Sequence, residues 1–366
     1  MSLDLFGRVM DALRIPHAIP PGLYPIGEPG PQSPVLATGN FGLTVRRIKK
    51  ALIGRDAWLL VANSKGINVW CAAGGGHFTH HSIIAGIRAS QVQDRVQHRN
   101  LILPQLSATG IERHKITEAT GWTTKWGPAR LEDLADYMDN GGHVREAQRF
   151  MRFPLWERLE MASLWAVPLS AIVLLLLGFL LDWRTGSVAA GGTFLVVVLP
   201  FVGLPWLRIT GGLGWLTFGT LTLVGFLSEA GVLALWDGVD TTRLLVLGVV
   251  NVAVMLVVGA DLSGSTPWYP SSIGLFRNQF HLEIVEEACT GTAECVLVCP
   301  RNVIHMDGQR RKAEITRPQD CVRCGACIVQ CPRDALRFRY LDGRIVEPGT
   351  VRSTKVNMLG RRTVSR

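Results

Sequence analysis

Seven of the eight cysteines in this 366-residue chain lie between residues 289 and 331. The downstream group has the spacing Cys321-x2-Cys324-x2-Cys327-x3-Cys331-Pro332. Three thiolates on one short loop, followed by a cysteine that precedes a proline, are typical of the ligands of a cubane iron–sulfur cluster. Zinc sites are tetrahedral and separate, and paired motifs that end in Cys-Pro fit them poorly. The spacing therefore predicts iron–sulfur clusters that carry electrons.

The upstream group of cysteines is incomplete. It reads Cys289-x5-Cys295-x3-Cys299-Pro300, with Thr292 where a further cysteine would complete the usual spacing. In two-cluster ferredoxins the fourth cysteine of each motif ligates the other cluster. The predicted ligands are Cys289, Cys295 and Cys331 for the first cluster, and Cys321, Cys324, Cys327 and Cys299 for the second. We expect one complete 4Fe-4S cluster and one 3Fe-4S or incompletely ligated 4Fe-4S cluster, whose odd iron takes water or a hydroxyl.

The eighth cysteine, Cys71, lies apart in a segment of small residues that follows an apolar run at 57–62. The segment ends in the glycine run 74–76. Such a run after a strand can cradle a phosphate at a helix N-terminus, although the pattern alone is weak evidence. A lone cysteine with small neighbours is more often a buried core residue. The residues alone leave both interpretations open.

The formal net charge of the chain is +9, and the stretch 301–366 accounts for all of it, with 15 Lys and Arg against 6 Asp and Glu. A nucleic-acid binder can have such a charge. Because the cysteine motifs lie in or just before the same stretch, we instead expect a basic electron-transfer module that faces acidic lipid headgroups, and no nucleic-acid partner. No signal-peptide pattern precedes the first domain, so the thiols are expected to face a reducing cytoplasm, which favours metal ligands over disulfides.

Hydrophobic residues make up 48% of the chain and charged residues only 18%, which is too apolar for an ordinary soluble protein. Four nearly uncharged runs of about the length that crosses a bilayer explain this composition. The predicted spans cover residues 161–181, 187–207, 209–228 and 244–260. Pro200 and Pro205 are expected to mark the break between the second and third spans, with a turn near 204–212. Glu229, at the edge of the third run, is predicted to be interfacial rather than a functional intramembrane acid.

Four spans place both soluble parts of the chain on the same side of the membrane. Arg149, Arg152 and Arg158 precede the first span, whereas the loop 237–242 is acidic. Positive charge collects on the cytoplasmic side of membrane proteins. We therefore expect a multi-pass protein of the cytoplasmic membrane, with both soluble domains facing the cytoplasm.

The part before the spans has an α/β pattern. Apolar runs at 34–37, 57–62 and 101–103 alternate with polar helical stretches such as 81–89. This alternation predicts a doubly wound parallel sheet. The expected order is an α/β domain (1–150), an α-helical transmembrane domain (151–262), a linker (263–274) and an α+β two-cluster ferredoxin domain with a basic tail (275–366).

The segment Asn68-Val69-Trp70-Cys71-Ala72-Ala73-Gly74 resembles the cap-helix motif of the corrinoid protein of bacterial mercury methylation. That protein is itself similar to the corrin-binding domain of the corrinoid iron–sulfur protein large subunit. Residues 21–24, 33–36, 101–106 and 127–130 also resemble this family, which has apolar spans after the domain. The C-terminal block, including residues 355–361, is similar to the family's separate ferredoxin partner. The chain thus resembles a fusion of two proteins.

The resemblance implies that the α/β domain 1–150 is a corrinoid-binding domain and holds a base-off corrinoid of the cobalamin type. Residues 68–74 are then expected beneath the ring, with Cys71 as lower axial ligand to cobalt and catalytic residue. A thiolate trans to a methyl group weakens the cobalt–carbon bond, so the methyl group leaves as a carbanion equivalent toward an electrophile. The fused clusters would then return the cobalt to Co(I). The expected function is a membrane-anchored, corrinoid-dependent methyltransferase. Its expected partners are membrane lipid, a methyl-donor protein or methyl-folate type donor, and a low-potential electron donor.

The chain departs from this family at three places. Gly75 stands in place of a lysine, His77 in place of a threonine, and the tail 362–366 lacks the terminal cysteine pair of the ferredoxin partner. One cap cysteine and seven cluster cysteines account for all eight, so no thiol remains to deliver Hg(II). The acceptor therefore stays open, with mercury methylation proper and a membrane-bound electron-transfer protein without corrinoid as alternatives. A metal site at His77, His80 and His81 is less expected than three surface histidines.

Overall fold

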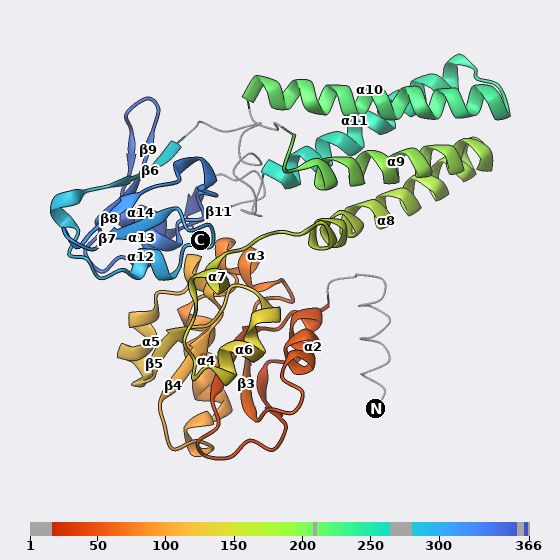
Figure 1. The fold of residues 1–366 in the computed structure, drawn as a ribbon. Helices are drawn as coiled ribbons and strands as arrows, with labels where there is room; N and C mark the ends of the chain where they lie inside the picture. The colour runs from red at the N-terminus through yellow and green to blue at the C-terminus, as the bar shows by residue number, and fades with distance from the viewer. Residues whose placement is uncertain (1–16, 208–210, 264–279, 357–361, 365–366) are drawn as a thin grey trace.

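The computed structural model describes residues 17–207, 211–263, 280–356 and 362–364. Within these ranges the chain forms an N-terminal α/β domain, a group of four long apolar helices, and a C-terminal domain of short strands and helices (Figure 1). The predicted linker at 263–274 lies almost entirely outside the described residues.

The N-terminal domain is built on a five-stranded sheet with the order β1-β3-β2-β4-β5. The strands are β1 (Gly22–Ile26), β2 (Val35–Gly39), β3 (Ala57–Ala62), β4 (Asn100–Leu103) and β5 (Thr123–Trp126). Strands β2 to β5 run parallel, whereas β1 pairs antiparallel with β3. The prediction of a parallel sheet is confirmed for four strands and wrong at the β1 edge. β1 has no apolar run that reveals it, and it contains Pro25, which an edge strand tolerates because one of its sides forms no ladder.

Helices cover both faces of this sheet, as a doubly wound arrangement requires. They are α2 (Gly42–Ala51), α3 (Val69–Gly74), α4 (His80–Ser90), α5 (Arg113–Thr120), α6 (Leu134–Asp139) and α7 (Glu146–Arg149). Neighbouring residues of a strand point to opposite faces. Leu59 accordingly packs in a core with α2 and α6, and Leu60 packs in a core with α4 and α5. Because the sheet is buried on both sides, β3 is apolar along nearly its whole length.

The short helix α3 is held in place by a cap and a glycine contact. Asn68 Oδ1 accepts a hydrogen bond from the Cys71 N–H at 3.0 Å, which fixes the start of the helix. The helix packs on the 3₁₀ turn Gln105–Thr109 that follows β4. A Cβ at Gly110, directly after this turn, would lie 2.5 Å from the carbonyl oxygen of Ala73, so only glycine allows the two segments to approach this closely.

Four long helices follow the N-terminal domain. They are α8 (Leu155–Leu180), α9 (Trp183–Gly203), α10 (Gly211–Trp236) and α11 (Thr241–Ser263). All four are long and apolar enough to cross a membrane by length and composition. Each predicted span overlaps one of them, but α8 begins at Leu155 rather than at residue 161, so its first turns carry charges. Pro200 lies inside α9 instead of ending it, because a proline in the last turn removes only one hydrogen bond of the helix. Part of the predicted turn, residues 208–210, lies outside the described residues.

Charged residues on these helices lie near the helix ends, either beside the α/β domain, as in the first turns of α8, or at the end away from it, with one exception. Arg184 and Arg243 pair there with Asp182 and Asp237, which joins the α8–α9 loop to the α10–α11 loop. The exception is Glu229, whose side chain is 2% exposed inside the helix group. The prediction that Glu229 is interfacial is wrong, because packing against neighbouring helices buries it and sequence position along one helix does not reveal this.

The C-terminal domain has the α+β composition that the sequence predicts. Its elements are β6 (Phe280–Ile284), α12 (Glu294–Leu297), β7 (Ile304–Asp307), β8 (Lys312–Ile315), α13 (Ala326–Gln330), β9 (Leu336–Tyr340), β10 (Ile345–Val346), α14 (Pro348–Ser353), β11 (Thr354–Val356) and β12 (Arg362–Val364). Strands β10, β9 and β6 form one antiparallel sheet, and β7–β8 and β11–β12 form two pairs. The helices α12 and α13 carry Cys295 and Cys327, one from each cysteine motif.

Candidate cofactor and cluster sites

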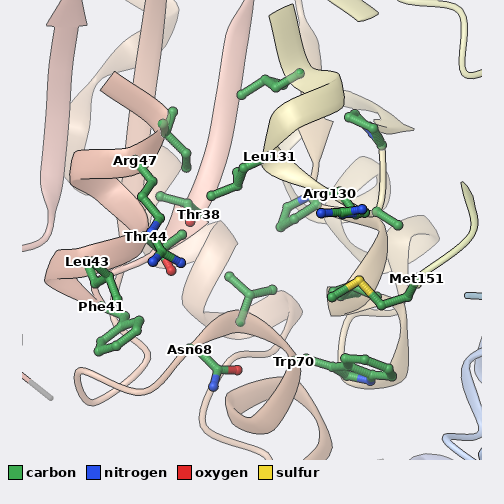
Figure 2. Close-up of a pocket in the computed structure, with 18 of the residues that line it drawn as sticks. Thr38, Phe41, Leu43, Thr44, Arg47, Asn68, Trp70, Arg130, Leu131 and Met151 are labelled. Atoms are coloured by element: carbon green, nitrogen blue, oxygen red, sulfur yellow. The ribbon is translucent and has the colours of Figure 1, made fainter. Parts of the chain in front are cut away.

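A cavity of about 320 Å³ lies where the N-terminal domain meets the first long helix. Its walls come from α2, α3, the ends of β2 and β4, the loop after β5, and the first turns of α8. Figure 2 shows Asn68 and Trp70 of α3 on one side of it, with Arg47 and Arg130 on opposite walls. Most of the lining is apolar. The volume is at the lower end of the range of about 300–1000 Å³ for small-molecule sites, and the carboxyl ends of parallel strands are where α/β sheets bind ligands.

The predicted contact residues 68–74 divide into two groups. Asn68, Val69, Trp70 and Cys71 line the cavity. Ala72 and Ala73 are buried behind them against the core of the sheet, and Gly74 ends the helix outside the lining. The glycine run 74–76 does not line the cavity either, so the phosphate-cradle interpretation has no support in this structure.

Cys71 is a partly exposed residue of the cavity wall, which excludes the interpretation of a buried core cysteine. Asn68 forms two hydrogen bonds with Cys71. The Oδ1 atom of Asn68 accepts from the Cys71 N–H, and its Nδ2 atom donates toward the Cys71 Sγ at 3.5 Å. These two hydrogen bonds fix the position of the sulfur. The arrangement therefore presents a soft sulfur ligand to whatever fills the cavity.

Polar atoms without protein partners give a test of the implied corrinoid. Trp70 and Thr38 both line the cavity. The indole Nε1 of Trp70 and the hydroxyl of Thr38 are buried and have no hydrogen-bond partner within the described part of the chain. Buried polar atoms normally have one. A corrinoid is a flat apolar ring rimmed by amide groups, so it suits an apolar wall with a few orphaned polar atoms. Together with the sulfur ligand, these residues fit the group.

The start of α8 closes one wall of the cavity. Glu157, Glu160, Met161 and Leu164 line it, and their spacing places them on one face of the helix. The Arg47 guanidinium donates to both carboxylate oxygens of Glu160 at 2.7 and 2.8 Å, and Arg130 donates to Glu157 at 3.0 Å. Sequence reasoning missed this wall. The signal was the pair of glutamates three residues apart just before an apolar span.

The seven remaining cysteines line two separate small cavities. Cys289, Cys295 and Cys331 line one of them with Thr292. Cys299, Cys321, Cys324 and Cys327 line the other. The structure thus brings together both predicted ligand sets, and their ligation of iron stays a prediction.

Burial controls the ionisation of these thiols. Burial, with the nearby thiols of Cys331 and Cys289, raises the pKa of Cys295 to about 12, and burial raises the pKa of Cys321 to about 11. Such thiols ionise at neutral pH only when they bind a cation, so cluster assembly should release protons. Backbone N–H groups of Val303 and Ala335 donate to the sulfurs of Cys299 and Cys331, both at 3.3 Å. Hydrogen bonds of this kind tune cluster potentials.

Two side chains are near the place where the first motif lacks a cysteine. Thr292 is exposed and lines the first cavity. Glu294 does not line it, and instead forms an ion pair with Arg113 of the N-terminal domain. Burial raises the pKa of Glu294, with Arg113 opposing this effect. Thr292 is therefore the better placed of the two to face an odd iron.

The less expected alternative, a metal site at His77, His80 and His81, is not assembled. The rings of His80 and His81 are tilted against each other, with centroids 4.2 Å apart, and His80 Nδ1 lies 3.8 Å from Glu112. Burial, with the charge of Lys65, lowers the pKa of His77. In the ranges that the structure describes, no group of three His, Cys, Asp or Glu residues converges to hold a single metal ion.

The C-terminal domain packs directly on the cavity domain. Val322 and Cys324, from the loop of the second cysteine set, belong to one apolar cluster with Trp70 and Phe153. Trp70 and Phe153 are stacked, with ring centroids 5.6 Å apart. The cysteine loop and α3 are therefore neighbours in one core.

Hydrogen bonds fix this contact. Gln330 Nε2 donates to the carbonyl oxygens of Ala108 and Ile111 at 2.8 and 2.6 Å. The Met151 N–H donates to the carbonyl oxygen of Pro300 at 2.8 Å. The side chain of Gln330 is buried, so its loss would leave two carbonyls without partners in the interface.

Comparison with known proteins assigns two parts of the chain. Residues 6–138 match the family model described as CO dehydrogenase/acetyl-CoA synthase delta subunit. Residues 288–342 match the 4Fe-4S dicluster domain. The second match confirms an iron–sulfur domain of the ferredoxin type, and neither match covers half of the chain.

Curated relatives match over about a third of the chain. Acetyl-CoA decarbonylase/synthase complex subunit gamma from Methanopyrus kandleri is 34% identical over 134 residues, which is 36% of this chain and 29% of the relative. The subunit of the same name from Archaeoglobus fulgidus is 37% identical over 135 residues, 36% of this chain and 28% of the relative. The subunit of that name from Methanocaldococcus jannaschii is 36% identical over 129 residues, which is 35% of this chain and 26% of the relative. The chain spans less than a third of the length of these relatives, and the link to mercury methylation stays a prediction.

Proposed function

We propose that this chain is a membrane-anchored corrinoid iron–sulfur protein of methyltransferase type, with Cys71 as the lower axial ligand to cobalt. One observation carries the proposal. The helix α3 lies between the cavity, which Cys71 lines, and the loop of the second cysteine set, which packs on Trp70. A cofactor in the cavity and a cluster in that loop would be separated by little more than one helix.

The corrinoid, when bound, supplies a cobalt atom that carries a methyl group. The residues of the chain bind and orient this group. Asn68 orients the Cys71 sulfur, and Trp70 and Thr38 offer polar atoms to the rim of the ring. The ion pairs of Arg47 and Arg130 with α8 hold the facing wall and limit the access of water.

The C-terminal domain is proposed as the built-in reductant. The second cysteine set is close to α3, so a cluster held by Cys299, Cys321, Cys324 and Cys327 would supply electrons to the cavity, and a cluster held by the first set would receive them. Gln330 serves as a positioning residue because it fixes the cysteine helix α13 to the cavity domain. An external low-potential donor would supply the electrons, and a methyl-donor protein or a methyl-folate type donor would supply the methyl group.

An anaerobic preparation of the full chain tests this function. We expect a corrinoid absorption spectrum beside that of the clusters, and reduction of the cobalt when a low-potential donor is added. Gln330→Leu should slow cobalt reduction while the cluster spectrum stays unchanged, since two unpaired carbonyls weaken the docked arrangement by about 1–3 kcal/mol each. Gln97→Leu, which removes an exposed contact with Gln32 inside the N-terminal domain and away from the interface, is the matched control.

The methylated protein is then tested against Hg(II), arsenite and thiols. Transfer to Hg(II) would establish mercury methylation proper. A preparation with clusters and no bound corrinoid, even after reconstitution, would contradict the proposal and favour the electron-transfer protein.

We also propose that α8 to α11 cross the cytoplasmic membrane, with both soluble domains on the cytoplasmic side. The even number of helices and the contact between the two domains support this. Reporter fusions before Met1 and after Arg366 should therefore both report cytoplasm, and a fusion in the 237–240 loop should report the opposite side. Opposite locations for the two ends would contradict the four-span arrangement.

A further inference from the structure

The helix group contains a buried polar pair that the proposed function does not use. Glu229 of α10 and Asn251 of α11 are each 2% exposed. Asn251 Nδ2 donates to Glu229 Oε2 at 2.6 Å and to the carbonyl oxygen of Leu247 at 2.9 Å. Burial of a charged carboxyl group among apolar helices costs free energy, so the presence of Glu229 there points to a function.

Two glycines make room for this pair. A Cβ at Gly192 of α9 would lie 1.9 Å from Glu229 Oε1, and a Cβ at Gly225 of α10 would lie 2.6 Å from Asn251 Oδ1. The polar groups therefore lie directly against helix backbone, with no space for a side chain between. The pair therefore lies inside the packing contact of α9, α10 and α11 and not at its edge.

Two oxygen atoms of this pair accept no hydrogen bond within the described part of the chain. Both hydrogens of the Asn251 amide are used, one on Glu229 and one on Leu247. Glu229 Oε1 and Asn251 Oδ1 are buried and have no partner in the described part of the chain. Both atoms are oxygens that accept, so the site lacks a positive group or a donor.

Among the residues that the structure describes, no charged side chain supplies it. The neighbouring buried cluster, Val173, Leu177, Ala189, Leu233 and Leu247, is apolar. It lies toward the far ends of the helices, where Asp182, Arg184, Asp237 and Arg243 pair with one another. Gly192 of α9, Gly225 of α10 and Asn251 of α11 bring no charge to the carboxyl group.

We propose that Glu229 and Asn251 form a proton-binding site in the helix group, in which Glu229 takes up one proton from water and is held as a neutral carboxylic acid. The added hydrogen provides the missing donor and removes the buried charge. A proton fits better than a sodium ion, because a metal cation needs several oxygen ligands and this site offers only two free ones in close packing.

Chemical labelling of the full chain in liposomes tests the site. Dicyclohexylcarbodiimide is lipid-soluble and adds to protonated carboxylic acids in apolar surroundings. We expect one reagent per chain, located at Glu229 by mass spectrometry, with less labelling as the pH rises. Glu229→Gln keeps the shape and should reduce labelling to background. Asp237→Asn, which removes an exposed, ion-paired acid, should leave it unchanged.

Infrared spectroscopy gives a second reading that does not depend on access of the reagent. The wild type should show the C=O band of a protonated carboxylic acid, and Glu229→Gln should lose it. Absence of this band from the wild type would overturn the proposal. Protection of Glu229 by sodium chloride at constant pH would also overturn it and indicate a sodium site. Neither reading involves corrinoid or clusters, so failure here is separate from failure of the proposed function.

Discussion

Replacement of Cys71 by alanine is expected to shift the visible spectrum of the bound Co(III) corrinoid and to lower methyl transfer by about 100-fold. The shift follows from loss of the sulfur that lies in the cavity wall, and the loss of rate from a stronger cobalt–carbon bond. A 100-fold effect corresponds to about 2.7 kcal/mol of transition-state stabilisation. Binding of the corrinoid should largely persist, because the apolar wall and the atoms of Trp70 and Thr38 are unchanged.

Asn68→Ala is a milder change at the same site. It keeps the sulfur but removes the N–H donor at 3.5 Å and the helix cap. We expect the sulfur-ligated spectrum with a smaller shift and a smaller loss of rate, together with a loss of stability of about 1 kcal/mol. A spectrum of Cys71→Ala identical to that of the wild type would remove Cys71 from the cobalt site.

Thr292→Cys is expected to complete the first cluster. An iron without a protein thiolate is held only by sulfides and an exchangeable ligand, so air-exposed wild type should show the EPR signal of an oxidised three-iron cluster. The substitution restores the two-residue spacing on both sides, from Cys289 to 292 and from 292 to Cys295. It should abolish the three-iron signal and raise the iron content by about one per chain.

The first cavity offers a matched control for this change. Thr290 also lines it, so Thr290→Cys adds a thiol to the same cavity at a position that breaks the spacing. It should leave the three-iron signal in place. Two stable four-iron clusters in oxidised wild type would instead mean that a side chain ligates the odd iron. Thr292→Val would then identify the hydroxyl, since Glu294 is engaged with Arg113.

Some of the fold and site could be predicted because local chemistry determines it. The cysteine spacing grouped the seven thiols as the two cavities do, because the cysteine that precedes the proline in each ferredoxin motif belongs to the other cluster. The apolar runs at 57–62 and 101–103 became β3 and β4 because central parallel strands are buried on both faces. Apolar length alone located the four long helices.

Other features depend on contacts between distant segments, and no local pattern reports them. The partner of Glu229 is 22 residues away on another helix, so its position near the end of an apolar run suggested an interface where there is a buried pair. Nothing in the sequence around Gln330 predicts that its side chain donates hydrogen bonds to backbone carbonyls more than 200 residues earlier. The edge strand β1 is short, contains Pro25 and has weak alternation, so propensity alone did not find it.

The wall that α8 gives to the cavity has a consequence for how substrates arrive. The same helix face that carries Glu157 and Glu160 continues into the apolar part of α8, so in the proposed arrangement the cavity lies at the membrane surface. A partner that reaches it from the lipid diffuses in two dimensions. The rate of encounter then depends on the number of molecules per unit area of membrane, and dilution of the bilayer with inert lipid should slow turnover even when every bulk concentration is kept constant.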